Sequence, residues 1–287
     1  MRYEAPETLD AAVALLAGAP GTARVMAGGT DLLVQLRTDM IRPDLVVDIK
    51  RIGEMRGVTS AADGGFLVGA AVTGAELKEH GKLKAAWPGV VEAANLIGST
   101  QVQGRATMGG NLCNGSPAAD SVPALIAAGA VAVVAGPGGR RELPVEDVMT
   151  GPRKLALAKG EIVIAFRLPA RPAHSADAYL RFIPRTEMDI AVVGAGVSLT
   201  RDGGGRITAA RVGLGAVAAR PLLVKAAADA IIGTSLDAAA LEKLAAAASA
   251  ACQPIDDKRG TVEFRTKVAG VMARRAAAIA YERAGQR

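Results

Sequence analysis

Two glycine-rich stretches, far apart in the chain, limit most strongly what this sequence can fold into. The first runs from residue 27 to 33 with the sequence AGGTDLL, and the second from residue 107 to 120 with the sequence TMGGNLCNGSPAAD. Glycine allows the positive φ angles of tight turns and has no side chain to keep a ligand away from the backbone. Successive backbone N–H groups in such turns form a concavity that binds anions. Two such stretches in one chain predict a diphosphate that is held from both sides.

The composition fits one large domain or two smaller ones with an aliphatic core. Half of the 287 residues are hydrophobic but only 3% are aromatic, so we expect no base-stacking surface for single-stranded nucleic acid. The formal net charge is +6, and segment 253–287 alone holds eight Lys or Arg against four Asp or Glu. This segment is either a solvated helix face or a docking face for an acidic partner subunit. We expect no nucleic-acid partner.

The two cysteines, Cys113 and Cys252, are too few and too far apart for a cysteine-rich zinc site or an iron–sulfur cluster. We therefore expect no metal in this chain. Two cysteines in a chain of this size are typical of a reduced cytosolic protein. The first residues lack the apolar core of a signal peptide, and no apolar run approaches the roughly 20 residues of a membrane helix. We expect a soluble, cytoplasmic protein without a membrane span.

The opening strand–loop–helix–strand pattern predicts a small α/β lobe at about residues 1–55. A Thr73-x-x-Glu76 pair predicts a capping box at a helix start, and Pro88 predicts a helix restart. The polar, glycine-rich segment 98–120 is predicted as a long functional loop. The other predicted elements are helices at 6–16, 31–38, 84–97 and 122–128 and strands at 24–27, 44–49, 66–70, 130–135 and 162–168.

The segment 171–175 is the predicted boundary between residues 1–173 and a C-terminal domain at 174–287. In that domain three strands followed by three helices predict an α+β arrangement. Gly194-Ala195-Gly196 has two of the three glycines of a dinucleotide fingerprint, but it lies inside a predicted strand and is not interpreted as such a site. The predicted strands are 178–183, 191–199 and 206–215, and the predicted helices are 222–231, 236–252 and 262–284.

No set of catalytic residues stands out in the sequence. The absence of a Walker A sequence excludes a P-loop for ATP or GTP. His80 and His174 are predicted as surface residues, and no Ser-His-Asp arrangement can be assembled. We therefore predict no catalytic residue in this chain.

Three motifs together resemble those of a known family. They are AGGTDLL at 27–33, TMGGN at 107–111 followed by SPAAD at 116–120, and MDIAVVGAG at 188–196. In this order they resemble the FAD-binding medium subunit of the molybdenum hydroxylases, which include aerobic carbon monoxide dehydrogenase and bacterial xanthine dehydrogenases. The resemblance covers nearly the whole chain. It implies a two-lobed FAD-binding domain of the vanillyl-alcohol-oxidase/PCMH type at 1–173, with lobes at about 1–55 and 56–173. A C-terminal α+β domain at 174–287, with a three-stranded antiparallel sheet and helices, would follow it.

The resemblance also implies which residues hold FAD. The first stretch would wrap the diphosphate, the second would add further contacts, and residues elsewhere would lie along the flavin. Thr30 and Thr107 carry hydroxyls that can donate to phosphate oxygens, and Arg181 can place positive charge near the flavin. The implied cofactor-binding residues are Met26, Ala27, Gly28, Gly29, Thr30, Asp31, Leu32, Ile97, Thr107, Gly110, Asn111, Ser116, Asp120, Val163 and Arg181.

Structural roles remain open alternatives for four residues. Asp31 and Asp120 are each placed to cap the helix that follows. Arg181 could instead form a surface salt bridge. Cys113 fits the role of a small buried side chain that fills space.

The resemblance further implies partners and electron carriers. Molybdopterin and [2Fe–2S] clusters are expected on a large molybdopterin subunit and a small iron–sulfur subunit, in a dimer of heterotrimers. FAD would pass electrons from the clusters to a quinone, NAD⁺ or O₂. Neither His80 nor His174 lies in a flavin loop, so FAD is expected to be bound non-covalently. Met188 stands where some relatives carry an acidic residue, which weakens the expectation that NAD⁺ is the acceptor.

Two other classes of function stay open from the sequence. A self-sufficient flavin-dependent oxidoreductase would need a base beside the flavin, and only Tyr179, Arg185 and Glu187 are candidates. A non-enzymatic, basic interaction protein would leave both glycine-rich stretches unexplained.

Overall fold

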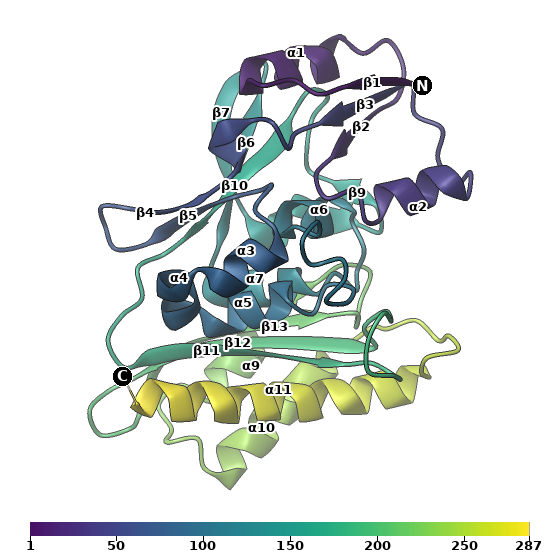
Figure 1. Ribbon diagram of the computed structural model, residues 1–287. Helices are drawn as coiled ribbons and strands as arrows, with labels where there is room; N and C mark the ends of the chain where they lie inside the picture. Colours follow the sequence, from purple (N-terminus) through teal and green to yellow (C-terminus); the bar gives the residue numbers. More distant parts are fainter. Residues whose placement is uncertain (287) are drawn as a thin grey trace.

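The chain builds three stacked parts, which a computed structural model describes for residues 1–286. Figure 1 shows a small N-terminal lobe at the top, a lobe around a larger sheet in the middle, and a C-terminal sheet lined by long helices at the bottom. None of the helices within residues 1–286 is long and apolar enough to cross a membrane.

The first lobe is a three-stranded parallel sheet in the order β1-β3-β2. Its two longer strands and both helices agree with the prediction within a few residues, whereas the three-residue strand β1 is too short to show a pattern. The helix predicted from Pro6 begins instead at Leu9, because the Thr8 hydroxyl accepts the Ala11 N–H and caps it. The elements are β1 (Arg2–Glu4), α1 (Leu9–Gly18), β2 (Ala23–Met26), α2 (Leu32–Arg37) and β3 (Leu45–Asp48).

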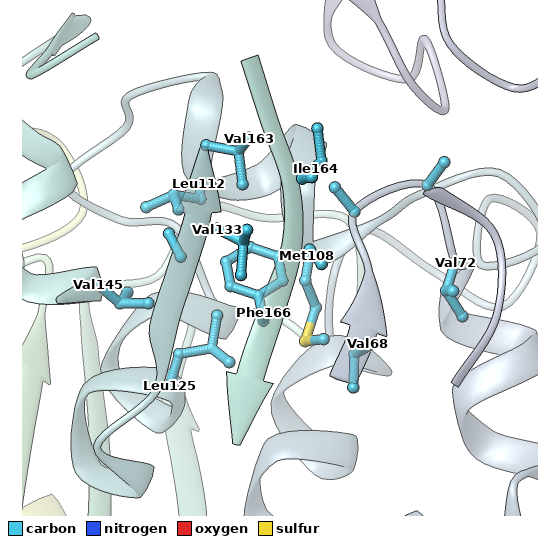
Figure 2. Close-up of a cluster of buried hydrophobic side chains, with 14 of the residues drawn as sticks. Val68, Val72, Met108, Leu112, Leu125, Val133, Val145, Val163, Ile164 and Phe166 are labelled. Carbon is cyan, nitrogen blue, oxygen red and sulfur yellow. The ribbon is translucent and has the colours of Figure 1, made fainter. Parts of the chain in front are cut away.

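The second lobe contains a five-stranded antiparallel sheet in the order β4-β5-β10-β6-β7. Phe166, on the central strand, is fully buried, and Figure 2 shows it among aliphatic side chains that include Val133 and Leu125. Strand β7 was not predicted, because it is an exposed edge strand with charged residues such as Arg140 and Arg141. The strands are β4 (Val58–Ser60), β5 (Phe66–Gly69), β6 (Val131–Gly136), β7 (Gly139–Pro144) and β10 (Ile162–Leu168), with the hairpin β8 (Met149–Gly151) and β9 (Lys154–Leu155) beside them.

The helices of the second lobe follow local signals. The capping box of Thr73 and Glu76 is present, and a new helix starts at Pro88. The prediction of a continuous loop at 98–120 is wrong, because a helix begins after Thr107, whose hydroxyl accepts the Gly110 N–H. The helices are η1 (Gly53–Met55), α3 (Gly74–Glu79), α4 (Gly81–Ala86), α5 (Pro88–Ala94), α6 (Met108–Cys113), α7 (Ser121–Ala128) and α8 (Val145–Val148).

The C-terminal part is an antiparallel sheet in the order β11-β12-β13-β14. The predicted number of three strands is wrong, because Leu222 and Leu223 pair with β13 as a fourth strand before the next helix begins at Lys225. Helix α11 lies along one face of this sheet, and α5 and α7 lie on the other (Figure 1). The elements are β11 (Ser175–Phe182), β12 (Val193–Arg201), β13 (Ile207–Gly215), β14 (Leu222–Leu223), α9 (Lys225–Asp229), α10 (Ala238–Ala250) and α11 (Val262–Gly285).

Helix α7 lies close to the C-terminal sheet because glycines face it. A Cβ atom at Gly196 would lie 2.6 Å, and one at Gly213 2.2 Å, from the Pro123 carbonyl oxygen. All eight residues of α7 are buried. Gly196 therefore serves helix–sheet packing, which agrees with excluding the Gly194-Ala195-Gly196 sequence as a dinucleotide site.

Two hydrophobic cores fill the molecule. One holds buried side chains from Leu9 to Leu168 together with Tyr179, and the other holds side chains from Ala176 to Ala284. The cores meet at β11, where the buried Arg171 guanidinium lies 2.7 Å from the Asp177 carboxylate. A domain division between residues 173 and 174 is compatible with these cores and stays a prediction.

Candidate functional site

A cavity of about 520 Å³ lies between the first and second lobes, and both glycine-rich stretches line it. Segments of the β9–β10 region and the turn after α5 complete its wall. The structure thus brings together stretches that are far apart in the sequence. The predicted site residues that line the cavity are Ala27, Gly28, Gly29, Thr30, Asp31, Leu32, Ile97, Thr107, Gly110, Asn111 and Val163.

The first glycine-rich loop leaves β2 in a conformation that only glycine accepts easily. Gly29 has a φ of +79°, and its carbonyl accepts the Leu33 N–H at 3.0 Å as α2 begins. A Cβ atom at Gly28 would lie 1.9 Å from the Arg105 carbonyl oxygen, so the loop touches the backbone that leads into the second stretch. These two glycines are therefore required by the loop's own geometry.

The second stretch supplies the start of α6. The Asn111 Oδ1 atom accepts the Ser121 N–H at 3.0 Å and the Ser121 hydroxyl at 2.7 Å, so Asn111 ties the second stretch to the start of α7. Within residues 1–286 the Asn111 amide NH₂ donates to no partner, and it is available to a ligand. A Cβ atom at Gly110 would lie 3.7 Å from Ala27 Cβ, which shows how closely the two stretches approach.

Several backbone donors at the cavity lack acceptors. In the described part of the chain, the N–H groups of Gly28, Gly29, Thr30 and Gly109 make no hydrogen bond. Gly29 and Gly109 are buried, and buried backbone donors in proteins are nearly always paired. An anion between the two stretches would satisfy these donors.

The cavity also carries an excess of positive charge that the motifs did not reveal. Arg24, Arg153 and Lys159 line it, and none of the three has an ion-pair partner among residues 1–286. Of its two carboxylates, Glu161 is engaged by Arg141 at 2.7 Å, and Asp31 has no ion pair within the same residues. The sequence motifs do not point to these three cations, because the cations come from separate segments outside the glycine-rich motifs.

Four predicted site residues do not line the cavity. Met26 is buried at the end of β2, and the Ser116 hydroxyl accepts the Ala118 N–H at 3.2 Å. Arg181 and Asp120 form an ion pair of 3.1 Å, and their side chains are 4% and 10% exposed, so the interpretation of Arg181 as a surface salt bridge is wrong. Arg181 also donates to the carbonyl of Leu96 at 2.6 Å, next to the cavity wall.

The capping alternatives for the two aspartates are wrong. Neither Asp31 nor Asp120 makes a side-chain cap bond to its helix. At the start of α7 the Asn111 Oδ1 atom accepts the Ser121 N–H instead. Burial raises the pKa of Asp120 to about 6, although Arg181 and the Tyr179 hydroxyl act in the opposite direction.

The candidates for other chemistry have structural roles. Burial raises the pKa of Cys113 to about 12, so its thiol stays neutral at the cavity wall. His80 accepts the Leu83 N–H through Nδ1 and caps α4. Tyr179, Arg185 and Glu187 do not line the cavity. In residues 1–286 there is no group of His, Cys, Asp and Glu side chains that could hold a metal ion.

Comparison with known families identifies the ligand class. Residues 1–171 match the model of the FAD binding domain in molybdopterin dehydrogenase, and residues 178–280 match that of the CO dehydrogenase flavoprotein C-terminal domain. The chain belongs to the FAD-binding subunits of the molybdopterin dehydrogenases. It is therefore a subunit of an oxidoreductase, and the resemblance seen in its motifs is confirmed.

Relatives of this FAD-binding subunit match along its whole length. The carbon monoxide dehydrogenase medium chain of Afipia carboxidovorans is 36% identical over 282 residues, which cover 98% of this chain and 97% of the relative. The xanthine dehydrogenase FAD-binding subunit of Escherichia coli O157:H7 is 32% identical over 284 residues, or 99% and 97% of the two chains. A chain of reconstituted CO dehydrogenase from Oligotropha carboxidovorans superimposes with a TM-score of 0.94 at 36% identity, covering 99% of this chain and 98% of the other.

The cavity suits FAD. Its volume of about 520 Å³ lies within the range of about 300–1,000 Å³ that is typical of cofactor pockets. The free N–H groups of the two stretches and the three unpaired cations match a ligand with two phosphates. FAD is the cofactor of this subunit. Its individual contacts with the predicted residues stay predictions.

Proposed function

We propose that this chain carries FAD in an electron-transfer complex with a small iron–sulfur subunit and a large molybdopterin subunit, arranged as a dimer of heterotrimers. Bound FAD accepts electrons and passes them on. The source would be the iron–sulfur clusters of the small subunit, and the final acceptor a quinone, NAD⁺ or O₂. The organic substrate would be oxidised on the large subunit.

One observation carries this proposal most directly. The cavity offers donors and cations for a diphosphate, but none of Tyr179, Arg185 and Glu187, the candidate acid–base residues, lines it. Self-sufficient oxidation that used one of these three side chains would need it within hydrogen-bond reach of the reacting atoms. The site therefore supports cofactor binding, and the match to a medium chain and an FAD-binding subunit of dehydrogenases favours electron transfer over self-sufficient oxidation.

We propose specific roles for the cavity residues. The free N–H groups of Gly28, Gly29 and Thr30 would bind one side of the diphosphate. The hydroxyl of Thr107 and the amide of Asn111 would bind from the other side. Ile97 and Val163 would pack against the flavin. Asp120 and Arg181 would shape the cavity wall through Leu96, because the structure places both side chains outside the cavity lining.

Two further expectations belong to the same proposal. The FAD-binding domain would comprise residues 1–173, and the C-terminal domain 174–287. The complex would work in the cytoplasm, which is compatible with two cysteines, Cys113 and Cys252, that form no disulfide. FAD would be held without a covalent bond, since the Cys113 thiol at the cavity wall is neutral.

The test is purification of the untagged protein from its native source, followed by absorption spectroscopy. We expect about one FAD per chain, released by heat without covalent attachment, and two co-purifying subunits that contribute iron–sulfur absorbance. A chain that purifies without flavin and does not take up added FAD would contradict the assignment of the cavity. A purified single chain that oxidises an organic substrate unaided would contradict the electron-transfer role.

A further inference from the structure

Lys50 lies directly behind the first glycine-rich loop. Strand β3 runs parallel to β2, so the chain that leaves β3 passes beside the loop that leaves β2. The Lys50 ammonium donates to the Ala27 carbonyl at 3.1 Å and to the Asp48 carboxylate at 2.6 Å. No sequence motif marks Lys50, because only the parallel pairing of β2 and β3 brings it to the loop.

Asp48 holds this lysine in place. The Tyr3 hydroxyl donates to Asp48 Oδ2 at 2.6 Å, and the Lys50 backbone N–H donates to Oδ1 at 3.0 Å. Burial would raise the pKa of Asp48, but the hydrogen bonds from Lys50 and Tyr3 outweigh burial and hold that pKa below its ordinary value. The side chain of Asp48 is only 6% exposed, so its charge fixes the ammonium in one position.

The bond from Lys50 orients one peptide unit of the loop. The Ala27 carbonyl and the Gly28 N–H belong to the same planar peptide and point in opposite directions. A carbonyl held toward Lys50 therefore turns the Gly28 N–H away from Lys50. Gly28 lines the cavity, and within residues 1–286 its N–H has no acceptor.

The loop needs such a support because its residues do not restrict this peptide. Glycine populates both signs of φ with little preference, so the peptides around Gly28 and Gly29 rotate more freely than others. A larger residue at Gly28 could not restrict the rotation of this peptide instead, since its Cβ atom would collide with the Arg105 carbonyl. A hydrogen bond from outside the loop fixes the peptide without adding a side chain.

We propose that Lys50 is a positioning residue of the FAD site, which holds the Ala27–Gly28 peptide so that the Gly28 N–H is presented to a diphosphate oxygen of the cofactor. The proposal rests on the proposed function of the cavity. Lys50 acts through the loop and does not need to contact FAD. This role predicts that replacement of Lys50 weakens binding of the diphosphate part of the ligand and leaves binding of the flavin ring unchanged.

The test compares the complex carrying Lys50→Met, Lys50→Arg or the control Lys84→Met after removal of FAD. Lys84 is an exposed lysine on α4, remote from the cavity lining. Each complex is titrated with FAD, with ADP and with riboflavin, which lacks both phosphates. We expect Lys50→Met to weaken FAD and ADP binding on the order of tenfold, as for loss of one hydrogen bond to a charged group. Riboflavin binding should stay unchanged, and Lys50→Arg should retain most of the affinity.

Unchanged FAD affinity in Lys50→Met, or an equal loss for riboflavin, would overturn the positioning role. A wild-type complex that binds no FAD would instead overturn the proposed function, so the two failures are distinct. Tyr3→Phe provides a second variant, since it removes one bond to Asp48 and leaves Lys50 intact. It should weaken FAD and ADP binding in the same pattern by a smaller factor, and wild-type affinities for both ligands would contradict the role of the Tyr3–Asp48–Lys50 chain.

Discussion

The guanidinium of Arg181 on β11 lies 3.1 Å from the carboxylate of Asp120 at the start of α7, and both side chains are buried. The same guanidinium donates to the Leu96 carbonyl, which precedes the cavity residue Ile97. The pair therefore joins the C-terminal sheet to two segments that border the FAD cavity. Loss of this ion pair should mainly lower the free energy of unfolding and should affect FAD binding less.

Replacement of Arg181 by Met should leave the Asp120 charge buried without a partner. Loss of one member of a buried ion pair typically costs about 3–5 kcal/mol. We expect a loss of about 3 kcal/mol in the free energy of unfolding at pH 8 and a smaller loss at pH 5, where the carboxyl can take up a proton. Urea unfolding at both pH values measures this. The double variant Arg181→Met/Asp120→Asn should recover part of the loss at pH 8, and a double variant no more stable than the single one would contradict this explanation.

Asp120 should also give the protein a specific pH dependence. Burial raises its pKa from 3.8 to about 6, so between these values the native state holds a proton that the unfolded state has released. The stability associated with this proton is fully present below pH 3.8 and is lost as the pH rises through about 6. Asp120→Asn should reduce the loss of unfolding free energy between pH 4.5 and pH 7 by on the order of 1–3 kcal/mol.

Unfolding free energies of wild type and Asp120→Asn at the two pH values test this dependence. Asp177, whose pKa burial likewise raises to about 6, remains in the variant, so part of the slope should persist. An identical slope in both proteins would show that Asp120 is ionised throughout this range.

Gly110 offers a direct test of the cavity. A valine there would place its methyl groups between the two glycine-rich stretches, since the Cβ position lies 3.7 Å from Ala27 Cβ and 3.1 Å from the Thr107 hydroxyl oxygen. Gly110→Val should abolish FAD retention and leave the circular dichroism spectrum unchanged. Gly29→Val should also lose FAD, but its φ of +79° adds backbone strain and makes the result less specific.

Gly104→Val is the matched control, because a Cβ atom at Gly104 would meet nothing within 4 Å. FAD occupancy per chain, measured by absorbance after gel filtration, separates the variants. Full occupancy in Gly110→Val would show that the ligand does not pass between the two stretches.

The contact between Gln35 and Asn114 holds α2 over the cavity. Helix α2 has no buried residue, and the Gln35 amide donates to Asn114 Oδ1 at 2.9 Å. Removal of this bond by Gln35→Ala should increase hydrogen exchange in residues 32–37 and speed FAD dissociation by several-fold, or about 1 kcal/mol. Asn114→Ala should have the same effect, whereas Arg37→Ala, at an exposed position of α2, should not. Equal FAD release from all three variants would rule out this bond as the restraint.

Elements with strong local signals could be predicted from the sequence. The capping box of Thr73 and Glu76, the restart at Pro88 and the buried strand β10 depend on neighbouring residues, and the structure confirms them. Strand β14 could not be predicted, because Leu222 and Leu223 become a strand only through pairing with β13. Helix α6 was missed because its glycines disfavour a helix, and the Thr107 cap and packing under the cavity override that preference.

The same distinction holds for the candidate site. The glycine-rich motifs located the loops because backbone conformation is encoded locally. Lys50, Arg153 and Lys159 carry no local signal, since their relation to the cavity arises only from tertiary structure. Asp120 and Arg181 were selected through the resemblance, and the structure brings them together in a buried pair beside the cavity, not in its lining.

Gly213 should couple the packing of the C-terminal sheet to the FAD site. A Cβ atom there would lie 2.2 Å from the Pro123 carbonyl oxygen, so Gly213→Ala must push α7 away from the sheet. Such overpacking costs about 1–3 kcal/mol of unfolding free energy. Because Asn111 in the cavity accepts two hydrogen bonds from Ser121 of α7, the displacement should also weaken FAD binding.

Gly203→Ala, at a turn with nothing within 4 Å of the added carbon, is the control and should change neither the unfolding free energy nor the FAD affinity. Urea unfolding and FAD titration of both variants measure the two effects. A destabilised Gly213→Ala protein with wild-type FAD affinity would show that α7 moves without carrying Asn111 with it.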